Sequence, residues 1–231
     1  MNVGDIVSHT DMCLREGRML QHGMNFRVKP DHSVILMSRR KGAPYEDEVL
    51  NDGQILIYEG HDVPRTRGVK DPKAFDQPRV TFTGRLTPNG KFEKAATEAK
   101  CGASEPERVR VYEKIKDGIW TYNGVFLLKD VGFQKSGARR VFKFRLELTD
   151  AELPDSSERP ILKLEHNRLI PSNVKFEVYK RDGGKCVICG ATDNLHFDHD
   201  YPFSKGGTSM SAKNIRLLCM RHNLAKSDHI E

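Results

Sequence analysis

The sequence lacks any run of apolar residues long enough to cross a membrane. A transmembrane helix needs about 20 consecutive, mostly apolar residues, and none occurs among the 231 residues, of which 37% are hydrophobic. The opening MNVGDIVSHTD also lacks the basic start and apolar stretch of a secretory signal. We therefore expect a cytoplasmic protein that has no membrane partner.

Cysteine is scarce, and its count of five is odd. Cys13 and Cys101 stand alone, whereas Cys186, Cys189 and Cys219 lie together near the C-terminal end. In a reducing compartment, clustered cysteines hold a metal more often than they form disulfides. The formal charge of +6 favours a polyanionic partner such as nucleic acid, although many other proteins share such a charge.

The first 150 residues have the sequence pattern of a β-rich domain. Short apolar or alternating segments predict strands at 34–38, 54–60, 79–86, 107–115 and 140–148. The clearest is RVFKFRLEL, in which apolar and charged residues alternate as on a half-buried strand. A helix is predicted within residues 11–23, ending at Gly23.

A polar, proline-containing stretch at residues 149–160, TDAELPDSSERP, marks a boundary. We divide the chain into a domain at 1–150, a linker at 151–170 and a small domain at 171–231. A short helix and a Gly-Gly break precede the clustered cysteines in the last segment.

The small domain carries a metal-ligand pattern. Cys186 and Cys189 are separated by two residues, and after 29 further residues Cys219 and His222 repeat that spacing. Two such pairs can complete the tetrahedral shell of a structural zinc ion. A domain of this size has little core of its own and gains stability from such an ion.

A second set of polar residues overlaps the first. Asp198 and His199 follow the strand-like LHF, and Asn214 and Asn223 come later. Adjacent residues on a helix diverge by about 100°, so His222 and Asn223 are expected to face different sites. These residues, in their cysteine setting, resemble the HNH nucleases of the ββα-metal class over about residues 171–229. The chain departs from that family at His222, where many members have cysteine, and at Asn223, where many have histidine.

This resemblance implies phosphodiester hydrolysis. His199 is the expected general base, because a neutral imidazole near its ordinary pKa can accept a proton from water. Asp198 and Asn223 are expected to hold one Mg²⁺ or Mn²⁺ ion through oxygen atoms, while Asn214 orients the histidine-bearing loop. His196 and Asp200 are either additional ligands or, the reading we favour, solvent-facing residues.

The first 150 residues resemble the SRA domain, also called YDG, in the order of four short motifs. They are YEDEV at 45–49, DG at 52–53, IYEG at 57–60 and TYNG at 121–124, the last in place of YDG. The resemblance implies that a modified cytosine is flipped out of duplex DNA and held between Tyr45 and Tyr58. Glu48 is the expected acceptor for the cytosine amino group, with Asp47 second.

Residues near this expected base site have assigned roles as well. The segment 61–73 is basic and is either a solvated loop or a phosphate-binding loop, in which case Arg65, Arg67 and Lys70 contact the DNA backbone. Met24 is a candidate to fill the space that the flipped base leaves.

Together the two resemblances predict an α+β protein in which a β-rich, SRA-like (PUA-like) barrel precedes a zinc-stabilised ββα-metal HNH domain. They imply a prokaryotic, modification-dependent restriction endonuclease that reads 5-methylcytosine or 5-hydroxymethylcytosine and cuts nearby, as a homodimer, since a double-strand break needs two active sites. Two alternatives stay open: a modified-DNA reader without catalysis, and a less selective HNH nickase or junction nuclease.

Overall fold

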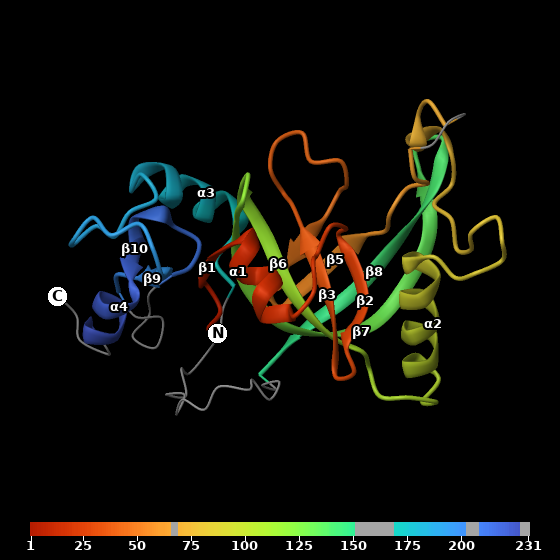
Figure 1. The fold of residues 1–231 in the computed structure, drawn as a ribbon, viewed down its shortest axis with the longest axis horizontal. Helices are drawn as coiled ribbons and strands as arrows, with labels where there is room; N and C mark the ends of the chain where they lie inside the picture. Colours follow the sequence, from red (N-terminus) through yellow and green to blue (C-terminus); the bar gives the residue numbers. More distant parts are fainter. Residues whose placement is uncertain (66–68, 151–168, 202–207, 227–231) are drawn as a thin grey trace.

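The structure is a computed structural model, which describes residues 1–65, 69–150, 169–201 and 208–226 (Figure 1). Its helices are α1 His9–Glu16, α2 Pro88–Lys100, α3 Ser172–Arg181 and α4 Met220–Lys226. Its strands are β1 Ile6–Ser8, β2 Met24–Lys29, β3 His32–Met37, β4 Glu48–Leu50, β5 Ile55–Glu59, β6 Arg108–Lys116, β7 Ile119–Ser136, β8 Arg139–Thr149, β9 Leu195–His199 and β10 Ile215–Cys219. In the described residues, no helix has the length and apolar character needed to cross a membrane.

Eight strands form one sheet in the order β2-β3-β6-β7-β8-β5-β4, and β1 pairs with the start of β7. Only β3 and β6 run parallel among the pairs described; the other pairs are antiparallel. The expected β-rich fold is therefore present, as a wrapped sheet whose end strands β2 and β4 are not paired with each other in the described residues.

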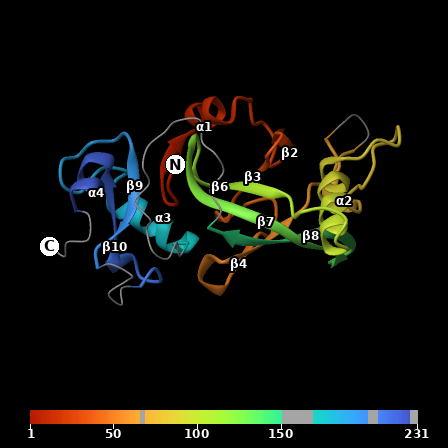
Figure 2. The ribbon, with the colours of Figure 1, turned by 90° about the horizontal axis from the view of Figure 1, so that it is seen from below.

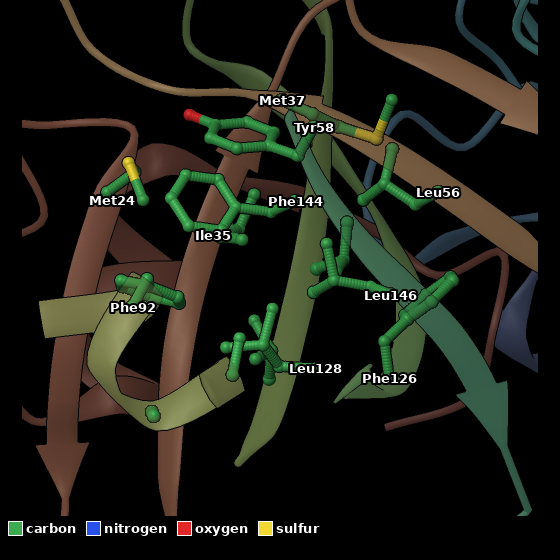
Figure 3. Close-up of a cluster of buried hydrophobic side chains, with 14 of the residues drawn as sticks. Met24, Ile35, Met37, Leu56, Tyr58, Phe92, Phe126, Leu128, Phe144 and Leu146 are labelled. Atoms are coloured by element: carbon green, nitrogen blue, oxygen red, sulfur yellow. The ribbon is translucent and has the colours of Figure 1, made fainter. Parts of the chain in front are cut away.

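One core lies inside this wrapped sheet. Side chains from β2, β3, β5, β6, β7 and β8 meet there, and α2 adds Phe92 (Figure 3). The alternation predicted for residues 140–148 is confirmed, because Phe142, Phe144 and Leu146 are buried in this core. Burying each such side chain contributes about 1.5–3 kcal/mol, so the core fixes the register of β8.

Several predicted elements differ from those observed. The first helix ends at Gly17, whose φ of 65° closes the helix in the left-handed conformation, and not at Gly23. The segment 79–86 is a tight turn, with one isolated bridge between Val80 and Leu86 in place of a strand. Sequence patterns also missed β2, β7 and α2, although Thr87 caps α2 and Pro88 opens it.

The C-terminal elements form a smaller unit. The strands β9 and β10 pair as an antiparallel hairpin, α3 precedes them and α4 follows. Ile170, Val174, Val178, Phe197 and Leu217 belong to its separate core. Figures 1 and 2 show this unit beside β1 and at the opposite end of the molecule from α2.

A buried ion pair fastens the smaller unit to the sheet. Lys175 on α3 places its ammonium group 2.9 Å from the Glu113 carboxylate on β6 and 2.7 Å from the Asn123 side-chain oxygen on β7. The Asn123 amide also donates to Glu113 at 3.2 Å. An aspartate at position 123 would instead set a second carboxylate against Glu113, which accounts physically for TYNG in place of TYDG.

The predicted boundaries at 150 and 171 stay predictions. Most of the predicted linker, residues 151–168, lies outside the described residues. At its far end Leu169 packs against Gly53, where a Cβ atom would lie 2.0 Å from the Leu169 Cβ. The glycine of the DG motif is thus required for this contact between the two parts of the chain.

Candidate nucleic-acid interface and metal centre

The structure brings Tyr45 and Tyr58 into contact with a third ring, His61. Tyr45 stacks on His61 with ring centroids 5.3 Å apart and an interplanar angle of 13°. Tyr58 meets the edge of the same ring: its hydroxyl lies 3.0 Å from His61 Nε2, and the two ring planes are tilted by 51°. Burial lowers the pKa of His61 to about 4, so this ring is neutral at physiological pH. Sequence reasoning missed His61, because a single histidine in a loop carries no periodic signal.

Of the two acidic candidates, Asp47 is the buried one. Its carboxylate is buried and accepts hydrogen bonds from the backbone N–H groups of Glu59 at 3.0 Å and Ser38 at 3.3 Å. Burial raises the pKa of Asp47 to about 7 despite these donors, and Asp47 in turn helps raise the pKa of Tyr58. Glu48, which we ranked first, is exposed on β4, and adjacent strand residues point to opposite faces.

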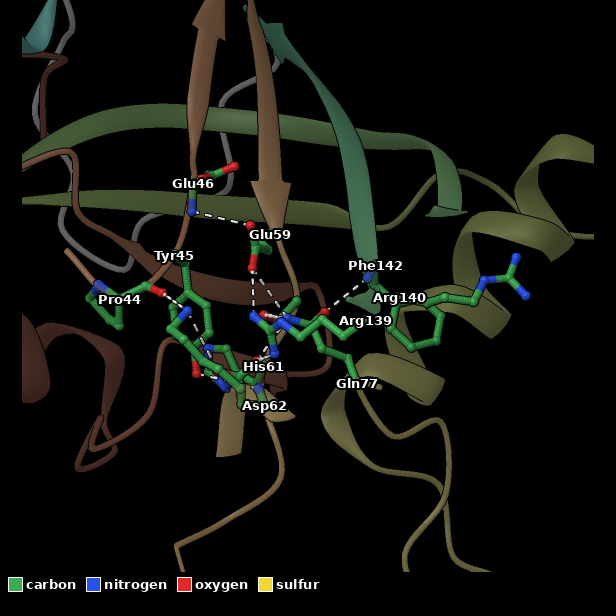
Figure 4. A network of polar contacts seen from close by, with 12 residues as sticks. Pro44, Tyr45, Glu46, Glu59, His61, Asp62, Gln77, Arg139, Arg140 and Phe142 are labelled. Carbon is green, nitrogen blue, oxygen red and sulfur yellow. Dashed lines mark hydrogen bonds and ion pairs between the residues drawn. The ribbon is translucent and has the colours of Figure 1, made fainter. Parts of the chain in front are cut away.

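A network of buried polar residues holds the segment from Glu59 to Asp62 in place (Figure 4). Arg139 on β8 pairs with the carboxylates of Glu59, at 3.3 Å, and of Asp62. The Lys143 ammonium group lies 3.1 Å from the Glu59 carboxylate. Gln77 donates to the Gly60 carbonyl at 2.6 Å and accepts from the Phe142 N–H at 2.8 Å. This network ties the rings to the end of β8, so their position depends on tertiary contacts.

Two of the three residues predicted to contact the DNA backbone lie within the described residues. Arg65 and Lys70 are exposed, as phosphate contacts require, and Arg67 lies outside the described residues. Met24 is 3% exposed in the main core, so it is wrongly placed to enter a DNA stack.

A separate basic cavity of about 500 Å³ lies between the loop 38–47 and α3. Arg40, Lys41 and Lys180 supply its charge, with Ile115, Phe176, Tyr179 and Gly183 completing the lining. Asp117 is the acidic group beside it, 3.3 Å from Arg40.

The metal-ligand pattern assembles as expected. The ligand atoms of Cys186, Cys189, Cys219 and His222 all lie within 4.8 Å of one another. Cys189 and Cys219 place their sulfurs 3.8 Å apart, and His222 Nδ1 lies 3.5 Å from Cys186 Sγ. A tetrahedral zinc ion separates its ligands by about 3.8 Å for sulfur pairs and about 3.5 Å for sulfur and nitrogen, from bond lengths of about 2.3 and 2.0 Å. The cluster therefore fits a metal such as zinc.

The electrostatics of the cluster agree with this assignment. Burial alone would raise the pKa of Cys186, but backbone N–H groups of the knuckle lower it to about 6. A thiol with that pKa is largely ionised at neutral pH, and the thiolate is the form that binds metal. Cys13 and Cys101 lie outside this cluster, as the sequence suggested.

The second predicted set lies on the β9–β10 hairpin and α4. His199 ends β9, and its Nε2 lies 2.8 Å from Ser209 Oγ. Burial lowers the pKa of His199, partly offset by the nearby Asp198, so the imidazole is neutral at physiological pH. Asn223 lies on α4, where its side chain is half-buried.

Asn214 makes the contacts that an orienting role requires. Its side-chain oxygen accepts from the Tyr201 N–H at 2.8 Å, and its amide donates to the carbonyls of Tyr201 at 3.1 Å and Thr208 at 3.0 Å. The amide thus joins the chain just after His199 to the chain just before Ser209. Pro202, Gly206 and Gly207, between these points, lie outside the described residues.

Lys226 is a member of this site that the sequence did not reveal. Its ammonium group is buried, lies 2.6 Å from the Asp198 carboxylate and donates to the His199 carbonyl. Nothing in the spacing of the D-H…N…N pattern indicates a lysine at the end of α4.

Of His196 and Asp200, which flank Asp198 and His199, one differs from our expectation. His196 was expected to face solvent, yet it is 7% exposed and its Nδ1 lies 2.6 Å from Asp5. The reason is that β9 packs against the N-terminal segment, where the Gly4 carbonyl accepts from the Phe197 N–H at 3.2 Å. Asp200 is exposed and pairs with Arg216 at 3.2 Å.

No protein-family model matches this chain, and a search of curated proteins found no match. Among solved structures, it is similar to the SUVH5 SRA domain in complex with hemi-methylated CG DNA, at 25% identity and a TM-score of 0.45, over 67% of this chain and 94% of that one. The SUVH5 SRA domain bound to fully hydroxymethylated CG DNA gives 22% identity and a TM-score of 0.42, over 64% and 89%.

A longer protein gives a similar result. Arabidopsis thaliana SUVH6, in complex with SAM, is 17% identical with a TM-score of 0.41, over 66% of this chain and 26% of that one. Because these TM-scores lie below 0.5, we argue the function of this chain from its own residues.

Proposed function

We propose that this chain is a modification-dependent DNA endonuclease that reads 5-methylcytosine or 5-hydroxymethylcytosine and hydrolyses a nearby phosphodiester bond. The observation that carries the proposal is the ring of His61, which stacks on Tyr45 and meets the Tyr58 hydroxyl at its edge, with the buried carboxylate of Asp47 close to Tyr58. A planar ring held in this way occupies the kind of space that an extruded pyrimidine needs.

In this proposal the flipped cytosine takes the place of the His61 ring. Stacking on an aromatic side chain contributes about 1–3 kcal/mol per base, which helps offset the few kcal/mol that unstacking costs. The carboxylate of Asp47 accepts from the cytosine N4 amino group. It retains lone pairs for this, since each of its oxygens accepts one backbone N–H.

The hydrolytic half of the proposal uses the β9–β10 hairpin. His199 accepts a proton from the attacking water, which its lowered pKa permits at neutral pH. Asp198 and Asn223 supply oxygen ligands for one Mg²⁺ or Mn²⁺ ion, whose charge would stabilise the phosphate and the leaving oxygen. The Lys226 ammonium group lies 2.6 Å from the Asp198 carboxylate, and this ion pair orients the carboxylate.

The two halves are joined by a charged surface and a rigid contact. Arg40 and Lys41 extend from the same loop that carries Tyr45, and Lys180 faces them from α3. We propose that a DNA strand passes over this cavity between reading and cutting. The buried pair of Lys175 and Glu113 keeps the spacing fixed, so we expect a narrow range of cut distances.

Double-strand cleavage needs a second active site, so we propose that two copies act together as a homodimer on duplex DNA in a prokaryotic cytoplasm. The test incubates matched plasmids containing cytosine, 5-methylcytosine or 5-hydroxymethylcytosine with the protein and Mg²⁺ or Mn²⁺. We expect cutting of a modified plasmid alone, with fragment ends at a constant distance from the mark.

Variants separate the two halves. Tyr45→Ala should lose the preference for modified DNA, whereas Tyr45→Phe, which keeps the stacking face, should retain it. His199→Ala should abolish cleavage and leave binding unchanged. Binding without cleavage by the unmutated chain would favour the non-catalytic reader, and equal cutting of all plasmids would favour the less selective nuclease.

A further inference from the structure

A fully exposed aromatic ring lies at the tip of the turn that follows Gln77. Phe82 has a relative exposure of 102%, the highest of the large apolar side chains in the described residues. Val80 at 46% and Leu86 at 38% flank it, and Arg85 is exposed as well. Covering an exposed phenylalanine gains the free energy of its burial, so the ring is available to an apolar partner surface.

Hydrogen bonds within the turn hold its backbone in one conformation, which fixes the position from which the Phe82 side chain extends. The Thr81 N–H donates to the Arg85 carbonyl at 2.8 Å, and the Gly84 N–H donates to the Thr81 carbonyl at 2.9 Å. Gly84 has a φ of 78°, a conformation that glycine adopts without strain. The Thr81 hydroxyl, 2.9 Å from that of Thr83, also accepts from the Arg85 N–H at 3.2 Å.

The foot of the turn is attached to the proposed base site. Asn89 accepts from the His61 N–H at 2.8 Å and donates to the His61 carbonyl at 2.8 Å. The same amide donates to the Pro78 carbonyl at 3.1 Å, and Thr87 donates to it at 2.7 Å. One side chain therefore links the backbone of His61 directly to the start of the turn.

Phe82 lies close in sequence to the foot of the turn. It follows Pro78 by four positions. Arg79 and Arg85 lie on the two arms of the turn, where cationic groups can contact phosphates on either side of an inserted ring. Arg79 is also paired with Glu93 on α2, which fixes the first arm.

We propose that Phe82 is the wedge that enters the DNA stack and fills the gap left when the modified cytosine is extruded. The proposal rests on the proposed function, because only a flipped base leaves such a gap. Apolar side chains inserted between base steps are a general means of stabilising distorted duplexes. Phe82 takes the part that we first assigned to Met24, which the core excludes.

The test compares two DNA substrates and uses the full chain in the His199→Ala background, so that no DNA is cut. One duplex carries 5-methylcytosine (or 5-hydroxymethylcytosine) opposite guanine, and the other carries the same mark opposite an abasic site, where no partner base must be separated. Affinities are measured by fluorescence anisotropy. A matched control is Leu14→Ala on α1, which removes another exposed apolar side chain (74%).

Phe82→Ala should weaken binding of the fully paired duplex by about 5- to 100-fold, the range for loss of one base–aromatic stack. The abasic duplex should lose at most about threefold, and Phe82→Trp should retain the parent affinity for both. Leu14→Ala should change neither. Equal losses on the two duplexes, or no loss on the paired one, would overturn the wedge. If the parent itself binds modified and unmodified DNA equally, the proposed base reading is wrong instead.

Discussion

Replacing Lys175 with methionine should destabilise the whole chain, because it removes the cation that is paired with the buried Glu113 carboxylate. The exposed fractions of the Lys175 and Glu113 side chains are 1% and 0%. Glu113 Oε2 accepts from Lys175 and Asn123. Removing one member of a buried pair costs about 3–5 kcal/mol, and we expect a loss in that range.

A double-mutant cycle tests this reasoning by urea unfolding at pH 7. Lys175→Met with Glu113→Gln should recover about 2–3 kcal/mol of the single-variant loss, because no charge is then left buried. As a control on the same helix, Lys180→Met removes an exposed ammonium group and should change stability by less than about 0.5 kcal/mol.

The pH dependence gives a second check on the same pair. In the parent, the pKa of Glu113 is lowered, despite burial, chiefly by the charge of Lys175. The pair therefore stabilises the fold above the unfolded pKa, and this contribution is lost as pH falls through the folded pKa. Without Lys175, burial raises that pKa, so the deficit of the variant should shrink as pH falls from 7 to 4. A deficit below about 1 kcal/mol that is independent of pH would refute the buried-pair argument.

Three other outcomes are expected. Cys186→Ser should reduce bound zinc, measured by elemental analysis, from about one ion per chain to near zero, since a tetrahedral site needs all four ligands; parent protein without zinc would contradict the ligand set. In the parent, the folded pKa of Asp47, about 7, lies above the unfolded value of about 3.9, so the free energy of unfolding should fall as pH rises from about 4 to 7. Asp47→Asn should remove this fall. Parallel plots of unfolding free energy against pH for parent and variant would contradict this. Reversing Lys41 and Lys180 to glutamate should reduce the slope of log affinity against log salt by about 0.9 per lost phosphate contact, whereas the same reversal of two lysines on α2, at the far end of the molecule, should not change it.

Local sequence signals were reliable where one interaction dominates. The alternation around Phe144 predicted β8, since a strand has a period of two residues, and the Cys-x2-Cys and Cys-x2-His spacing predicted the metal cluster. The same approach failed for residues 79–86, where alternation in RVTFTGRL suggested a strand. There Gly84 turns the chain back within four residues, and Phe82 is exposed instead of packed.

The proposed base site shows the limit of such signals. Its two tyrosines come from a loop and from β5, and their spacing in sequence does not indicate that both contact His61. The choice between Glu48 and Asp47 likewise depended on which face of the chain meets the backbone of Glu59. Lys226 and Arg139 entered their sites through contacts across 28 and 77 residues of chain, respectively.

The sequence by itself determined the β-rich character of the first part, the strand at β8, the four metal ligands and the identities of most candidate site residues. These follow from residue type and short spacing, which local geometry translates directly into structure. Only the tertiary structure decided that Asp47 is buried while Glu48 is exposed, that both tyrosines contact His61, and how the two units are fastened together. Those features depend on burial and on contacts between distant segments, and such contacts exist only once the sheet has wrapped around its core.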